Sequence, residues 1–127
     1  MPSGIGGTGA NYNKATGQGL YVLRNEAGEI KYIGRGDAPA RLATHADSID
    51  KGDLIGEVLY TNNLTKAQAK GLEQNLIDRF GGAARKNPDT PLLNQYRSYA
   101  PENINAPVYR DAVTGELLQE TLKRLGQ

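Results

Sequence analysis

The sequence predicts a small α/β (α+β) domain, a three-stranded antiparallel sheet flanked by helices with a C-terminal helical tail. Short apolar segments at 19–24, 30–34 and 54–60 have the composition of strands. A polar turn that contains a glycine joins the first two segments, which favours a tight antiparallel hairpin. A capping signal follows the second strand, and apolar residues at helical spacing follow the third, so helices are expected to flank the sheet.

Length and composition bound the possible functions. The 127 residues fit one domain, which is large enough to bury roughly two-thirds of its unfolded surface. The net charge of +1 excludes a general affinity for polyanions, so any nucleic-acid contact must come from a local patch. The absence of cysteine excludes disulfides and thiolate chemistry, and a single histidine excludes a histidine-rich zinc site. No apolar run is long enough to span a membrane.

The chain is expected to divide into a linker and a domain. Residues 1–17 are rich in Gly, Asn, Thr and Ser and show no apolar periodicity, which predicts a flexible linker to something larger. Residues 18–127 form the predicted domain, with a core at 19–94 and an accessory tail at 95–127.

Helix-start signals follow the hairpin and the third strand. Asp37 can cap a short helix that we expect to end near Ser48. Thr65 and Gln68 have the spacing of a capping box, which opens the longest helix of the chain. The two glycines at 81–82 are expected to end it.

The tail carries fewer signals. Two prolines, Pro88 and Pro91, predict a rigid loop at 87–91, and a second loop is expected at 100–107. Leucines at helical spacing predict a last helix at 116–125.

Glu73 is the sharpest anomaly on the long predicted helix. It projects from the middle of an apolar arc made by Ala69, Leu72, Leu76, Ile77 and Phe80. A carboxylate on a core-facing stripe costs several kcal/mol unless it is paired or binds a metal. Glu73 is therefore either a metal ligand or a glutamate that reaches solvent or pairs with an arginine.

Other polar residues are expected near the same spot. Tyr21 and Tyr32 lie at matching ends of the hairpin strands, and Arg41 and His45 share one helix face because they are four residues apart. Asn94 follows the proline-bearing loop. Each has an ordinary alternative, since tyrosines often pack in sheets, Arg/His pairs are often solvated and asparagines often occupy turns.

Taken together, these residues resemble the motifs of the GIY-YIG endonuclease superfamily. Residues 19–21 (GLY) stand for the first tripeptide, with leucine in place of isoleucine, and residues 32–34 (YIG) match the second without change. The resemblance covers 19–94. It implies a GIY-YIG nuclease-like fold and catalytic roles for Tyr21, Tyr32, Arg41, His45, Glu73 and Asn94.

The resemblance implies metal-dependent hydrolysis of phosphodiester bonds in DNA or RNA. Glu73 would hold one Mg²⁺ or Mn²⁺, weakly in the free protein because a single carboxylate leaves several waters on the ion. Arg41 would clamp the phosphate, and Tyr21, with its pKa lowered by Arg41 and the metal, would take the proton of the attacking water. Tyr32 and His45 would position that water or relay its proton, and Asn94 would hold the active-site loop or a phosphate oxygen.

Basic residues around this spot predict where nucleic acid binds. We expect its phosphates to contact Lys31, Arg35, Arg79, Arg85 and Lys86. Such contacts position a nucleic acid without specifying its sequence.

Residues 71–82 and 87–99 resemble the toxin tips of bacterial polymorphic and contact-dependent inhibition systems. This resemblance implies a monomer that is secreted or delivered at the cell surface as part of a larger protein. It would act in the cytoplasm of the target cell and be neutralised by a cognate immunity protein. Two alternatives stay open: a housekeeping repair or mobile-element endonuclease, and a non-catalytic nucleic-acid-binding module of the same fold.

Overall fold

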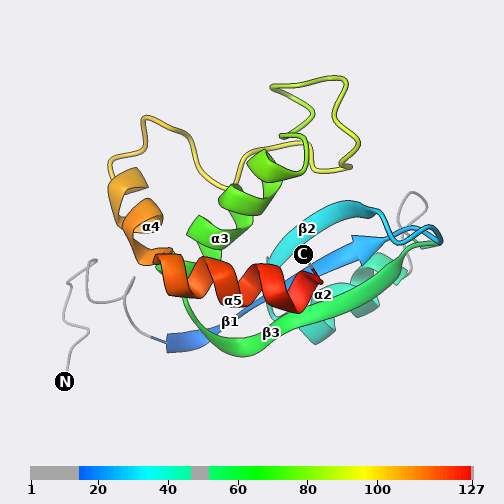
Figure 1. Ribbon diagram of the computed structural model, residues 1–127, viewed down its shortest axis with the longest axis horizontal. Coiled ribbons are helices and arrows are strands. Elements are labelled where there is room, and N and C mark those ends of the chain that lie inside the picture. The colour runs from blue at the N-terminus through cyan, green and yellow to red at the C-terminus, as the bar shows by residue number, and fades with distance from the viewer. Residues whose placement is uncertain (1–14, 47–51, 127) are drawn as a thin grey trace.

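Three antiparallel strands form the sheet of the computed structural model, which describes residues 15–46 and 52–126. The strands are β1 (Ala15–Arg24), β2 (Ile30–Gly36) and β3 (Ile55–Thr65), in the order β2-β1-β3 (Figure 1). Helices pack on this sheet, which confirms the predicted α+β class. Residues 1–14 of the predicted linker and the expected helix end at Ser48 lie outside the described residues.

The central strand β1 and the edge strand β3 are longer than the apolar pattern predicts. Strand β1 begins at Ala15, inside the segment expected to be linker, and β3 continues to Thr65. Ala15 pairs with Thr65 across the two strands. Pairing between backbones extends both strands through polar sequence, where side chains give no alternating signal.

The two helices that border the sheet begin where the sequence predicts. In α2 (Ala38–Ala46) the Asp37 carboxylate accepts a hydrogen bond from the backbone N–H of Ala40 at 3.3 Å. The capping box of α3 (Lys66–Arg79) is confirmed, because Thr65 and Gln68 exchange side-chain-to-backbone hydrogen bonds of 3.0 and 2.9 Å.

The tail holds one predicted helix and one unexpected helix. Helix α5 (Gly115–Leu125) confirms the helix expected at 116–125, and the Thr114 side chain caps it. Helix α4 (Ala106–Ala112) begins inside the segment expected to be a loop. It is only seven residues long, and the Tyr109 ring packs on Tyr99, 4.9 Å between centroids.

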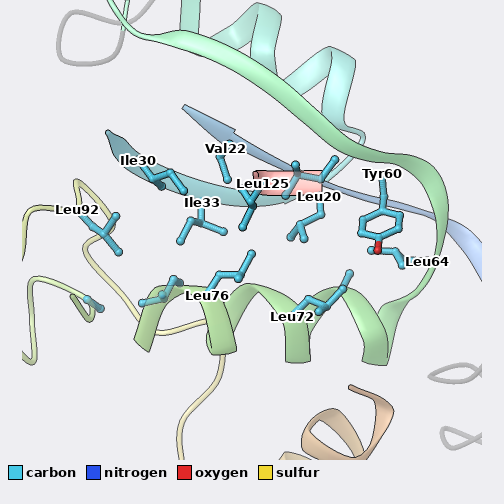
Figure 2. Packing of buried hydrophobic residues seen from close by; sticks show 14 residues of the cluster. Leu20, Val22, Ile30, Ile33, Tyr60, Leu64, Leu72, Leu76, Leu92 and Leu125 are labelled. Carbon is cyan, nitrogen blue, oxygen red and sulfur yellow. The ribbon is translucent and has the colours of Figure 1, made fainter. Parts of the chain in front are cut away.

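The core lies on both faces of β1. Leu20 and Val22 point toward α3, where they meet Leu72 and Leu76 (Figure 2). Tyr21 and Leu23 point to the opposite face, which α2 covers. Because successive residues of a strand alternate between faces, β1 carries an almost continuous apolar run.

The described helices include none that is both long and apolar enough to cross a membrane.

Candidate active site

A cleft of about 410 Å³ lies along the second half of β2, between α2, α3 and the loop that follows α3. The predicted site residues that line it are Tyr21, Tyr32, Arg41, Glu73 and Asn94. His45, the sixth, contacts Tyr21. The fold therefore brings together residues that are up to 73 positions apart (from 21 to 94) in the sequence.

Tyr21, Tyr32 and His45 form a cluster of rings at one side of the cleft. The Tyr21 hydroxyl and His45 Nε2 are hydrogen-bonded at 2.7 Å, and the Tyr32 and His45 ring centroids are 5.0 Å apart. Gly34 makes room for this cluster, because a Cβ at that position would collide with the Tyr21 ring. The last residue of the YIG tripeptide thus has a steric reason to be glycine.

The protonation state of Tyr21 differs from the expectation. Burial raises the pKa of Tyr21 well above its usual value, and Tyr32 raises it further, while the Arg41 charge acts in the opposite direction. Burial dominates because the residue is only 2% exposed. Arg41 thus lowers the pKa of Tyr21 as expected, but burial outweighs it, so the net shift without a metal is upward and Tyr21 is a neutral phenol next to His45.

Glu73 turns from the core-facing side of α3 into the cleft. Its side chain is 13% exposed, and its Oε1 lies 3.4 Å from Nε of Arg35. Burial raises the pKa of Glu73, and the Ser98 hydroxyl and the Arg35 charge oppose that rise. Ser98 Oγ makes no hydrogen bond of good geometry, although it is close enough to affect this pKa. Glu73 therefore pairs with an arginine, as one of the two expectations had it. Because that pair lies in the cleft, the other expectation, a metal ligand, stays a prediction.

Glu73 is the residue of the described cleft whose side chain could hold a divalent cation. Among the described residues, Glu73 is the only acidic side chain that lines the cleft, and no three His, Cys, Asp or Glu residues gather as a metal group. Mg²⁺ commonly binds through one or two carboxylates and keeps several waters. Arg35 competes for the same carboxylate, so the free protein is expected to bind the ion weakly.

Two further arginines face the cleft. Arg41 rises from α2 next to Gly36, whose φ of +113° favours glycine. Arg97, which the sequence did not single out, pairs with Asp78 at 3.5 Å. Together with Arg35, they give the cleft three arginines against a single acidic side chain among the described residues.

The predicted nucleic-acid contacts are only partly brought together. Arg35 lines the cleft, and Arg85 lies over the ring of Tyr96, a cleft residue, at 5.1 Å from its centroid. Lys31, Arg79 and Lys86 are not among the residues that line the cleft. Lys31 instead borders a separate pocket with Phe80 and Pro91.

The loop from 93 to 98 forms one wall of the cleft, and Asn94 attaches it to β2. The Asn94 side chain accepts a hydrogen bond from the Ile33 backbone N–H at 3.0 Å and donates one to the Ile33 carbonyl at 2.8 Å. Leu93 N–H donates to the Lys31 carbonyl. Because β2 is an edge strand, these bonds satisfy backbone groups that the sheet leaves open. Asn94 was expected either to hold this loop or to contact a phosphate oxygen, and in the structure its side chain holds the loop.

Arg97 and Ser98 were not predicted from the sequence as cleft residues, because neither interrupts an apolar pattern. The only available signal was the interleaving of basic and aromatic residues at 96–99.

Replacing Asn94 with alanine should lower the free energy of unfolding by about 2–4 kcal/mol, because two buried backbone groups of Ile33 lose their partners. Urea unfolding measures this loss. Asn63→Ala, at an exposed position of β3, is the matched control and should change stability little. Equal effects of the two substitutions would contradict the attachment role of Asn94.

No protein family matches the chain, and no curated protein or solved structure matches it with significance.

Proposed function

We propose that the protein is a metal-dependent nuclease that hydrolyses phosphodiester bonds of DNA or RNA, acting as an antibacterial toxin domain. One observation carries the nuclease proposal: a mostly buried carboxylate, Glu73, shares a cleft with three arginines and with Tyr21, whose hydroxyl is hydrogen-bonded to His45. Metal-assisted phosphodiester hydrolysis uses a cation ligand, a clamp for the anion and a proton acceptor, and the cleft with the adjoining His45 offers a candidate for each. The resemblance to GIY-YIG endonucleases supports the same function.

Glu73 would hold Mg²⁺ or Mn²⁺, which when bound polarises a phosphate oxygen and stabilises the leaving oxygen. Arg41 is exposed on α2, so its guanidinium can bind two phosphate oxygens at once. Arg35 offsets part of the cost of burying the Glu73 carboxylate in the absence of the ion.

The tyrosine–histidine pair provides the route for the proton. A neutral His45 accepts the Tyr21 hydroxyl proton at Nε2 while the Tyr21 oxygen takes a proton from the attacking water. Tyr21 ends as a neutral phenol, and His45 carries the proton as imidazolium. This relay does not require Tyr21 to ionise beforehand, which agrees with the raised pKa of the buried phenol.

The position of Glu73 favours an enzyme over a non-catalytic nucleic-acid-binding module. A carboxylate in the middle of a phosphate-binding cleft repels the ligand, so a module that only binds gains nothing from it. A carboxylate there is useful when a cation joins it to the phosphate.

The toxin part of the proposal rests on the resemblance of residues 71–82 and 87–99 to toxin tips. It includes delivery by a larger secreted or surface-attached protein, action in the target-cell cytoplasm and a cognate immunity protein. Arg35, Arg41 and Arg97 line the cleft, and Arg85 lies next to it. An immunity protein with acidic groups would gain on-rate and specificity there, and a standard interface of about 1,600 Å² would cover the cleft.

Expression of this protein in the bacterial cytoplasm should arrest growth, and Arg41→Ala should relieve the arrest. Colony counts after induction, with equal protein levels verified by immunoblot, measure both effects. Arg110→Ala, at an exposed site on α4 outside the cleft, should still arrest growth. Normal growth with abundant folded wild-type protein would argue against a toxin and favour the housekeeping nuclease.

A further inference from the structure

Tyr96 is a large exposed aromatic residue at the cleft that the mechanism above does not use. It is 66% exposed, yet it lines the same cleft as Tyr21, Arg41 and Glu73. A phenol ring offers a flat apolar face that is suited to stacking on another planar group. An aromatic ring left in water beside a phosphate-binding site therefore indicates a ligand group that covers it.

Backbone hydrogen bonds and the Arg85 side chain hold the segment that carries the Tyr96 ring. Ala84 and Arg85 donate backbone hydrogen bonds to the carbonyls of Asn94 and Gln95, at 2.8 and 3.0 Å. The Arg85 guanidinium lies over the Tyr96 ring, 5.1 Å from its centroid. The Asn94 side chain attaches the same segment to β2, two residues before Tyr96. After the ring, the Ser98 backbone N–H donates to the Gln74 side chain at 2.7 Å. The backbone on both sides of the ring is therefore held in place before any ligand arrives, which lowers the ordering cost of binding.

We propose that Tyr96, with Arg85 packed on it, is a stacking platform for an unpaired nucleobase next to the scissile phosphate. The substrate class is then single-stranded or looped nucleic acid. This inference rests on the proposed nuclease function and deepens it. Stacking on an aromatic ring is open to any base, whereas a base inside a duplex is already stacked on its neighbours.

The cleft favours a nucleotide as the group that covers the ring. Its volume of about 410 Å³ is in the range of small-molecule sites, and the arginines that line it bind the phosphate part of the same nucleotide. Arg85 adds positive charge beside the ring, which suits the negative backbone on either side of the base.

The test measures binding of a short oligonucleotide that carries one 2-aminopurine, single-stranded or in a duplex, as DNA and as RNA. The proteins carry Glu73→Gln so that the probe stays intact. Stacking on Tyr96 should quench the 2-aminopurine fluorescence of the single strand. Adding Tyr96→Ala should remove the quench and weaken single-strand binding by about 5- to 150-fold, the range expected for the loss of one stacked base. Duplex binding should change little.

Two variants serve as controls. Tyr96→Phe keeps the ring and should keep both the quench and the affinity. Ile104→Ala removes an apolar side chain that is 91% exposed and does not line the cleft, and it should change neither.

An unchanged quench and affinity in the Tyr96→Ala protein would overturn the inference and leave the ring as a contact for the proposed immunity protein. Cleavage assays on proteins with Glu73 intact separate this failure from failure of the proposed function. If the wild type cleaves nucleic acid and Tyr96→Ala cuts single strands and duplexes in an unchanged ratio, the stacking inference alone is wrong. If the folded wild type cleaves neither with Mg²⁺, the nuclease proposal itself is wrong.

Discussion

Glu73→Gln should abolish phosphodiester cleavage while the protein stays folded. The substitution keeps the shape of the side chain but removes the only acidic group lining the described cleft, and with it the proposed cation ligand. A loss of about 10³-fold or more is expected, because the ion carries much of the stabilisation of the developing charge. A fluorogenic nuclease assay with added Mg²⁺ measures the loss. Glu120→Gln, the same change on exposed α5, should keep full activity. Wild-type rates in the Glu73→Gln protein would refute the metal assignment.

The stability of the same variant provides an independent check. Burial raises the folded-state pKa of Glu73 above its usual 4.5. At pH values between 4.5 and the folded-state pKa, the folded protein therefore keeps a proton on Glu73 that the unfolded chain has lost. Wild-type stability should therefore fall as pH rises from about 4.5 through the folded-state pKa. Glutamine does not titrate, so the stability of Glu73→Gln relative to the wild type should increase over that window.

Urea unfolding of both proteins from acid to neutral pH measures the difference. A variant that instead loses stability relative to the wild type as pH rises would mean that the ion pair with Arg35 stabilises the fold more than burial of the carboxylate destabilises it.

Arg41→Lys should lower the cleavage rate by about 10²-fold or more, although the charge is kept. Lysine is a point donor and cannot bind two phosphate oxygens with the planar geometry of a guanidinium. The change should lower kcat more than it raises KM, because the clamp acts mainly on charge that develops in the transition state.

Arg110→Lys is the matched control, since Arg110 is exposed on α4 and does not line the cleft. It should leave both constants unchanged. Unchanged rates in the Arg41→Lys protein would show that any positive charge suffices at this position, and the two-point clamp would be wrong.

The sequence was most informative where the signal is local. The capping box at Thr65 and Gln68 and the hairpin between β1 and β2 depend on residues close together in the chain, and the structure has both. Tyr21 and Tyr32 approach each other because that hairpin joins their strands, with ring centroids 6.3 Å apart. The anomaly at Glu73 was visible because a carboxylate interrupts an apolar helical stripe.

Features that depend on distant contacts were not predictable in the same way. Helix α4 packs its Tyr109 on Tyr99, a residue outside its own pattern. The ion pair between Arg35 and Glu73 joins β2 to α3, and no spacing rule in the sequence indicates it. The predicted downward shift of the Tyr21 pKa was wrong in sign for the protein without a metal. Burial of the phenol is the largest cause of the shift, and burial depends on the fold, which the charges of nearby residues do not reveal.

The most direct test of a metal-dependent nuclease is cleavage itself. Purified protein is incubated with supercoiled plasmid, total RNA and purified tRNA, with Mg²⁺, with Mn²⁺ or with EDTA, and the products are resolved on gels. The account predicts that at least one substrate is cut with a divalent ion, that EDTA prevents the cut, and that Arg41→Ala prevents it as well. Folded wild-type protein that cuts none of the three with either ion, or that cuts equally well in EDTA, would contradict it.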